Sequence, residues 1–270
     1  MVNLGINLPA PAAGARLTEM GAAVIKVEPP GGDPLEENAR AWYRRLTAGQ
    51  TVERLDLKDP ADRARLDARL EGCDLLLTSS RPAALGRLGL GWPAIGERFP
   101  RLVQVAIVGY PHPRQDIPGH DLTYMAHLDL LSPPALPRTL MADIAGSERA
   151  VSAALGLLLA RERGLGPRYA EVALSDAAAA FAGPWESGMT GADGIVGGGL
   201  PAYGFYEAEG GWVALAAIEP HFQERLRVEL GLSALDRDAL AQAFRSRTPA
   251  QWEEWADARG IPLAAAGARR

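Results

Sequence analysis

The chain has 270 residues and a net charge of −5, with 47% hydrophobic and 23% charged residues. This composition is typical of a soluble globular protein, and it excludes an overall basic field that would attract nucleic acid or an anionic membrane. An anionic ligand therefore requires a local cluster of cations, and the length favours one large domain with a smaller second one.

The first two thirds of the chain alternate short apolar runs with helical patterns. Strands are predicted at 2–6, 22–28, 51–57, 73–79, 101–110 and 168–176. Helices are predicted at 7–21, 59–72, 92–100 and 143–164. Because the apolar runs lack clean alternation and are separated by helices, they indicate a parallel sheet covered on both faces.

A Gly-rich stretch then separates this α/β region from a different pattern. Two strands are predicted within 203–219 around Glu209-Gly210-Gly211, followed by helices at 221–231, 237–247 and 249–260. This is the pattern of a small α+β unit. We therefore predict a large domain over 1–183, a linker over 184–200 and a small domain over 201–270.

Several function classes are not indicated by the sequence. Cys73 is the only cysteine, so neither a disulfide framework nor a thiolate metal site is expected, and its apolar surroundings favour a strand core. The N-terminus lacks the pattern of a signal peptide and no run of 18 uncharged apolar residues occurs, which predicts a cytoplasmic chain without membrane contact. The Gly-rich segments at 28–36 and 86–92 lack the spacing of a dinucleotide fingerprint or a P-loop.

Asp143 occupies an apolar stretch, "LMADIAG", at the start of the longest predicted helix. Burying a carboxylate without partners is costly, so the residue requires an explanation. One explanation is a simple helix N-cap. The other is that Asp143 acts chemically while the N–H groups of the same helix terminus stabilise a developing oxygen charge.

Two further residues have both a plain and a chemical interpretation. His120, in "PGHD", is either a loop histidine satisfied by its neighbour Asp121 or a catalytic group. Glu219, in "AAIEP", is either a first-turn helix residue or a carboxylate that the second domain delivers into a cleft. The remaining histidines are assigned no chemistry.

An ordered set of segments resembles the family III CoA-transferases. The set includes "LTEMGAAVIKVEPPGGDPLE", "LDLKDPADRARL", "CDLLLTSSRPAALGRLGLGW", "RLVQVAIVGY", "PGHDLTY", "MADIAGS" and "RYAEVALSDAA". Within that family, "PGHD", "ADIAG" and "AAIEP" resemble the α-methylacyl-CoA racemase branch. The resemblance runs in order over nearly the whole chain.

The resemblance implies a Rossmann-like large domain, a smaller second domain and an interlocked homodimer that acts on acyl-CoA thioesters. CoA enters as part of the substrate, and no tightly bound cofactor or metal is expected. By resemblance, His120 and Asp143 serve as acid and base and Glu219 pairs with His120. In transferase-like members, the aspartate at the position of Asp143 is instead a nucleophile that forms an acyl anhydride.

The chain also departs from the family pattern. The basic segment that usually precedes "LDLK" is replaced by "LTAGQTVER", so Arg81 and Arg44 are predicted to contact the CoA phosphates. Only 23 positions separate His120 from Asp143 (143 − 120), where racemases carry a longer loop. The return of the family's C-terminal segment to the large domain is expected to be missing.

The presence of both His120 and Glu219 favours racemase-like proton exchange, because transfer requires only the aspartate and an accessible thioester. Two alternatives remain open: a CoA-transferase that uses Asp143 as nucleophile, and a non-catalytic relative of the family.

Overall fold

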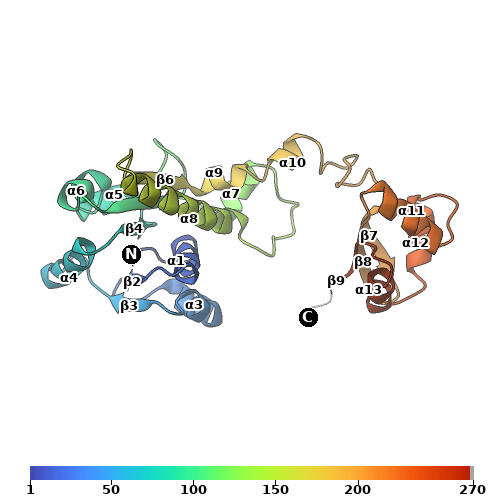
Figure 1. Cartoon of the computed structure of the whole chain (residues 1–270), viewed down its shortest axis with the longest axis horizontal. Helices are drawn as coiled ribbons and strands as arrows, with labels where there is room; N and C mark the ends of the chain where they lie inside the picture. Colours follow the sequence, from blue (N-terminus) through green and yellow to red (C-terminus); the bar gives the residue numbers. More distant parts are fainter. Residues whose placement is uncertain (268–270) are drawn as a thin grey trace. The chain divides into compact units, whose positions relative to one another are not determined.

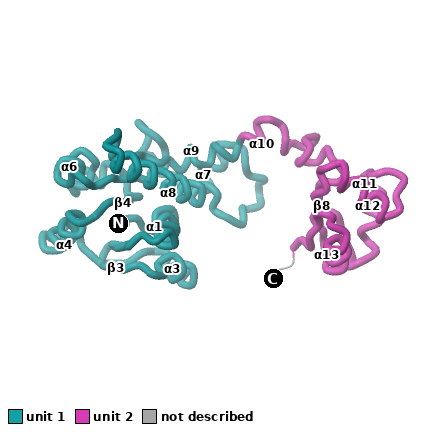
Figure 2. Tube along the Cα trace, viewed as in Figure 1, with its two compact units in different colours: residues 1–182 teal, residues 183–270 magenta. Residues whose placement is uncertain are grey.

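The computed structural model describes residues 1–267, which divide into two compact units. Unit 1 comprises Met1–Ala182, and unit 2 begins at Gly183 (Figure 2). The Gly-rich stretch predicted as a linker falls in unit 2, where it starts with a short helix, α10 (Gly183–Glu186). Among residues 1–267, no helix is long and apolar enough to cross a membrane.

Unit 1 is built on a six-stranded parallel sheet, which confirms the predicted α/β class. Its strands are β1 (Val2–Asn3), β2 (Ile25–Glu28), β3 (Thr51–Arg54), β4 (Leu75–Thr78), β5 (Val103–Val108) and β6 (Tyr169–Ala173). In space they follow the order β3-β2-β1-β4-β5-β6, and every neighbouring pair is parallel. This is the Rossmann order, in which the chain reverses its direction of winding between the first and fourth strands.

Helices cover both faces of the sheet (Figure 1). Unit 1 contains α1 (Pro9–Glu19), α2 (Pro34–Asn38), α3 (Arg40–Leu46), α4 (Pro60–Glu71), α5 (Pro82–Arg87), α6 (Trp92–Arg98), α7 (Asp121–His127), α8 (Met141–Glu162) and α9 (Leu174–Ala179). Leu75 and Leu77 of β4 lie in one core with α1 and α8, whereas Leu76 lies in the other core with α4, α5 and α6. This alternation of burial explains why the strands read as continuous apolar runs.

Two predicted boundaries differ from the structure for local reasons. The strand predicted at 168–176 ends at Ala173, and the following residues form α9, because "LSDAAA" has the alanine content of a helix. The stretch between β2 and β3 contains α2 and α3. Asp33 starts α2 by accepting a hydrogen bond from the Leu35 N–H, with Pro34 at the first helical position.

After α10, unit 2 combines a small antiparallel sheet with three helices. The sheet contains β7 (Tyr203–Ala208), β8 (Gly211–Ala216) and β9 (Leu263–Ala266) in that order, and the helices are α11 (Pro220–Glu229), α12 (Arg237–Phe244) and α13 (Pro249–Asp257). Gly210, with φ of 73°, closes the tight turn between β7 and β8. The third strand, β9, was not predicted; its short Ala-rich sequence resembles a helix end more than a strand.

Candidate functional site

A pocket of about 750 Å³ lies at the carboxyl ends of three strands of unit 1. Segments that follow β1, β4 and β5 contribute to its wall, including Ile6–Pro9, Ser79–Arg81 and Val108–Gly109. The winding of the sheet reverses between β1 and β4, and open parallel sheets bind ligands outside the strand ends at this position. The topology therefore makes this pocket the first candidate for a site.

The wall after β1 is held by a buried ion pair. Asp33 accepts a hydrogen bond from the Asn7 N–H at 2.9 Å, and its other oxygen lies 2.8 Å from Nζ of Lys26. Lys26 Nζ also donates to the carbonyl of Gly5 at 3.2 Å. Asn7 has φ of 67°, a conformation that non-glycine residues seldom adopt. These bonds fix a strained loop against the pocket.

The pocket wall also includes the first turn of α8, where Asp143 is the third residue. Two neighbours in "DIAGS" explain how this turn is positioned. A Cβ on Gly146 would lie 2.2 Å from Cδ2 of Leu174, so the glycine leaves room for the Leu174 side chain of α9 against α8. Ser147 is buried and donates to the carbonyl of Pro9, which ties α8 to α1.

Asp143 is coupled to a second carboxylate, Asp121. Oδ1 of Asp121 accepts a hydrogen bond from the backbone N–H of Asp143 at 3.1 Å, so Asp121 caps α8 from the neighbouring helix. Asp121 is 3% exposed, and its Oδ2 has no hydrogen-bond partner in residues 1–267. Burial, together with the negative charge of Asp121, raises the pKa of Asp143 to about 6.

The structure supports neither the interpretation of Asp143 as a simple helix N-cap nor that of His120 as a histidine satisfied by Asp121. Asp143 is not the capping residue of its own helix, because Leu140 holds that position and Asp121 supplies the capping bond. Within residues 1–267, no hydrogen bond joins Asp121 to the ring of His120. The Asp143 N–H is already bonded, so it is not one of the free donors expected at this helix terminus.

His120 lines the same pocket as Asp143 from the start of α7. It is exposed, and its backbone N–H donates to Oγ1 of Thr123 at 3.1 Å. The preceding Gly119 lies against Tyr124, since a Cβ there would approach the tyrosine ring to 2.6 Å. Burial raises the pKa of Tyr124 to about 12, so its phenol remains a neutral hydrogen-bonding group in the pocket wall.

The pocket contains two arginines. Arg81 and Arg87 lie at the two ends of α5, both line the pocket and both are exposed. Arg44 lies exposed on α3 and is not among the lining residues, whereas Trp42 of the same helix is. The structure therefore places Arg81 with His120 and Asp143, but not Arg44.

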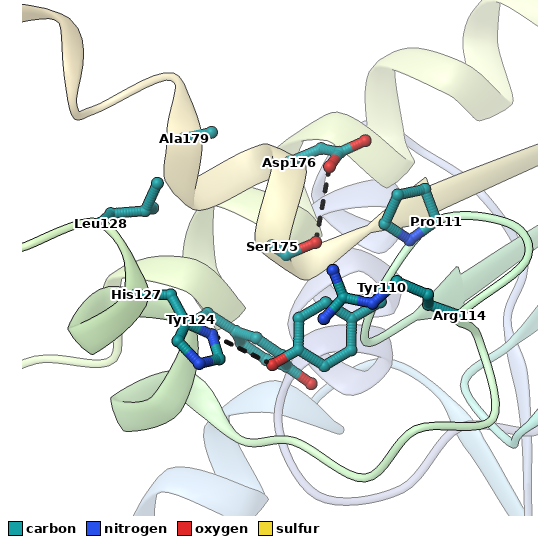
Figure 3. Close-up of a pocket in the computed structure, with 9 residues that line it drawn as sticks. All are labelled: Tyr110, Pro111, Arg114, Tyr124, His127, Leu128, Ser175, Asp176 and Ala179. Atoms are coloured by element: carbon teal, nitrogen blue, oxygen red, sulfur yellow. Dashed lines mark hydrogen bonds between the residues drawn. The ribbon is translucent and has the colours of Figure 1, made fainter.

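A smaller pocket of about 390 Å³ adjoins this one and shares Tyr124 with it (Figure 3). The hydroxyl of Tyr110 lies 3.4 Å from Nδ1 of His127, and the guanidinium of Arg114 lies over the Tyr110 ring at 4.4 Å. Ser175 donates to Asp176 on the opposite wall at 3.4 Å. In the described part of the chain, no group of three or more His, Cys, Asp or Glu side chains could hold a metal ion.

Glu219, the remaining predicted site residue, belongs to unit 2. It is the exposed N-cap residue of α11 and makes no side-chain capping bond. Its pairing with His120 remains a prediction.

Comparison with known proteins identifies the family. The sequence profile of CoA-transferase family III matches residues 1–268. The chain belongs to CoA-transferase family III. This confirms the resemblance carried by the ordered motifs.

Relatives within CoA-transferase family III include both a racemase and CoA-transferases. The α-methylacyl-CoA racemase of Homo sapiens is 28% identical over 93% of this chain and 72% of its own length. The cinnamoyl-CoA:phenyllactate CoA-transferase of Clostridium sporogenes is 35% identical over 46% of this chain. That alignment spans a third (33%) of the transferase, so the match covers a minority of its length.

Solved structures of similar proteins share the fold of this chain. A hypothetical protein from Mycobacterium tuberculosis superposes with a TM-score of 0.84 at 23% identity, covering 99% of this chain and 84% of that one. A CaiB/BaiF family protein from Brucella suis gives a TM-score of 0.78 at 17% identity, covering 99% and 82%. At these identities the likeness establishes the fold alone.

Sequence reasoning missed three members of the site. Asp121 was considered only as a partner of His120, and Tyr124 was not considered. Arg87 was not singled out either, because no local pattern distinguishes it from the other exposed arginines.

Proposed function

We propose that the chain acts on an acyl-CoA thioester and exchanges the proton on the carbon next to the thioester carbonyl. The observation that carries this proposal is the presence of His120 and of Asp143, with its raised pKa, in one pocket at the switch point of the sheet. A carboxyl whose pKa is raised to about 6 is both a usable acid and a usable base near neutral pH, and an imidazole in the same pocket offers a second group for proton transfer.

In this reaction, one of the two groups removes the α-proton, and the electron pair of the C–H bond moves into the thioester as an enolate. The other group returns a proton to the same carbon from the opposite face. Each group then recovers its starting protonation state by exchange with water. Burial, together with the negative charge of Asp121, keeps Asp143 basic enough to accept the proton.

We further propose that Arg81 and Arg87 contact the phosphates of CoA. Guanidinium groups bind phosphate through charge-assisted hydrogen bonds, and both side chains line the pocket and reach solvent. Alanine at either position should weaken CoA binding about tenfold. Arg44→Ala tests the contact that the resemblance implies, and unchanged affinity in this variant would exclude it.

A homodimer is also proposed. Exposed apolar side chains on α8, including Ile144, and Phe181 just after α9 provide surface that a second copy would cover. Light scattering of the full chain tests this assembly, and a monomer mass at micromolar concentration would contradict it.

The decisive experiment is to incubate the full chain with an acyl-CoA in D₂O and follow deuterium at the α-carbon by mass spectrometry. Wild-type protein should incorporate one deuterium per molecule, and Asp143→Asn and His120→Ala should each slow incorporation by at least about 10³-fold while remaining folded. Normal incorporation by folded Asp143→Asn would overturn the assignment.

Deuterium incorporation, combined with a test for inactivation by hydroxylamine, distinguishes proton exchange from the two alternatives. A transferase would show no α-exchange but would be inactivated by hydroxylamine during turnover, because hydroxylamine traps an acyl anhydride formed on Asp143. A non-catalytic relative would show neither result.

A further inference from the structure

Tyr124 of α7 places its hydroxyl beside the pocket of the proposed active site. The Tyr124 ring packs edge-on against Tyr110, with centroids 5.1 Å apart and planes at 82° (Figure 3). A Cβ on Gly109 would lie 2.5 Å from the Tyr124 hydroxyl, and a Cβ on Gly119 would lie 2.8 Å from it. Both glycines line the pocket that contains Asp143, and neither lines the smaller pocket. The hydroxyl end of Tyr124 therefore faces the proposed active site.

The hydroxyl of Tyr124 has no partner in the described part of the chain. It makes no hydrogen bond within residues 1–267, and it is not one of the fully buried polar atoms there. Tyr124 is 2% exposed, and this small exposed part therefore includes the hydroxyl. Phenylalanine would pack on Tyr110 in the same way without a polar atom, and a tyrosine hydroxyl inside a protein usually has a partner. The open side of the hydroxyl requires one in the pocket, either solvent or a bound molecule.

The position of Tyr124 relative to the two proton-transfer groups restricts the chemistry of that molecule. The Tyr124 N–H donates to the His120 carbonyl at 3.2 Å, so the two residues lie one helical turn apart. Burial raises the pKa of Tyr124 to about 12, and the carboxylates of Asp143 and Asp121 act in the same direction. The phenol is therefore a neutral donor near Asp143. Removal of an α-proton develops negative charge on the thioester oxygen, and a fixed neutral donor stabilises such a charge.

We propose that Tyr124 is a catalytic residue whose hydroxyl donates a hydrogen bond to the carbonyl oxygen of the acyl-CoA thioester. This inference rests on the proposed function. The hydrogen bond strengthens as the electron pair of the C–H bond moves into the thioester, and it weakens when a proton returns to the α-carbon. The phenolic proton stays on Tyr124 throughout, so Asp143 and His120 carry all the proton transfer.

The first test compares Tyr124→Phe with Tyr110→Phe, which each remove one phenolic hydroxyl and keep the ring. Tyr124→Phe should slow α-deuterium exchange about 10²-fold and change the dissociation constant of the acyl-CoA less than about threefold, because the bond is strongest in the transition state. Tyr110 does not line the proposed active site, so Tyr110→Phe should exchange within about twofold of wild type. Wild-type exchange by folded Tyr124→Phe, or equal losses in both variants, would overturn the proposal.

Infrared spectroscopy of bound acyl-CoA, labelled with ¹³C at the thioester carbonyl, tests the contact without turnover. A hydrogen bond weakens the C=O bond, so the carbonyl band should lie at a lower frequency in wild type and Tyr110→Phe than in Tyr124→Phe. Gly109→Ala, whose methyl group would displace the hydroxyl, should shift the band in the same direction as Tyr124→Phe. This variant keeps the test valid if Tyr124→Phe fails to fold. Equal frequencies in wild type and in the folded variants would refute the contact.

Together, the two measurements distinguish failure of this proposal from failure of the proposed function. A wild-type protein whose carbonyl band responds to Tyr124→Phe, but which exchanges no α-deuterium, would refute proton exchange and support the hydrogen bond. Normal wild-type exchange that Tyr124→Phe leaves unchanged would refute the hydrogen bond alone. Absence of acyl-CoA binding would refute both.

Discussion

Two clusters of charge lie inside unit 1, and only one of them contains a cation. In the first, Nζ of Lys26 lies 2.8 Å from Asp33 and 3.1 Å from Glu28, and all three side chains are inaccessible to solvent. In the second, the carboxyl groups of Asp121 and Asp143 adjoin without a cation, and one oxygen of Asp121 has no partner in residues 1–267.

The difference indicates two uses of buried charge. In the Lys26 cluster the ammonium contacts both carboxylates, and Nε of Arg54 lies 3.8 Å from the other oxygen of Glu28. The cluster fixes the loop after β1, so its role is to hold this pocket wall in place. In the aspartate pair, burial and the negative charge of Asp121 destabilise the ionised form of Asp143, which raises its pKa. We therefore expect the first cluster to stabilise the fold and the second to destabilise it at neutral pH.

The largest expected effect on stability comes from removing the cation of the Lys26 cluster. Lys26→Met leaves two buried carboxylates without their cation and should reduce the free energy of unfolding by about 3–5 kcal/mol. Urea denaturation at neutral pH measures this change. The other lysine of the chain, Lys58, is exposed, and Lys58→Met should stay within about 0.5 kcal/mol of wild type. A loss below about 1 kcal/mol in Lys26→Met would mean that the cluster does not hold the fold.

A smaller effect of opposite sign is expected from Asp143→Asn. The pKa of Asp143 is raised from 3.8 to about 6, so protonation of this group favours the folded state. That contribution is fully present below about pH 4 and is lost as the pH rises to about 6. Asparagine cannot ionise, and Asp143→Asn should therefore be more stable than wild type at neutral pH by up to about 3 kcal/mol.

The pH dependence distinguishes this effect from a change in packing. The stability difference between Asp143→Asn and wild type should disappear as the pH falls to about 4. Unfolding curves over this range provide the measurement. A difference that is constant with pH would contradict the electrostatic explanation.

Much of the fold is predictable from the sequence, because the central strands of a parallel sheet are apolar on both faces. The runs at 73–79 and 101–110 contain β4 and β5, and Asp59-Pro60 marks the start of α4 as predicted. Asp33-Pro34 gives the same signal for α2, but the short helix lacks a periodic apolar face.

Less of the site is predictable, because its key contact is tertiary. The order of the motifs identified His120, Asp143 and Arg81, which the structure brings to one pocket. The contact between Asp121 and the Asp143 N–H joins residues 22 positions apart, and no local pattern encodes it.

The most direct test of the account is the titration of the Asp143 side-chain carboxyl carbon by ¹³C NMR in the full chain. The account predicts a pKa of about 6 in the wild-type protein and a lower value in Asp121→Asn, where the neighbouring negative charge is removed. A wild-type value close to 3.8, unchanged by Asp121→Asn, would contradict it.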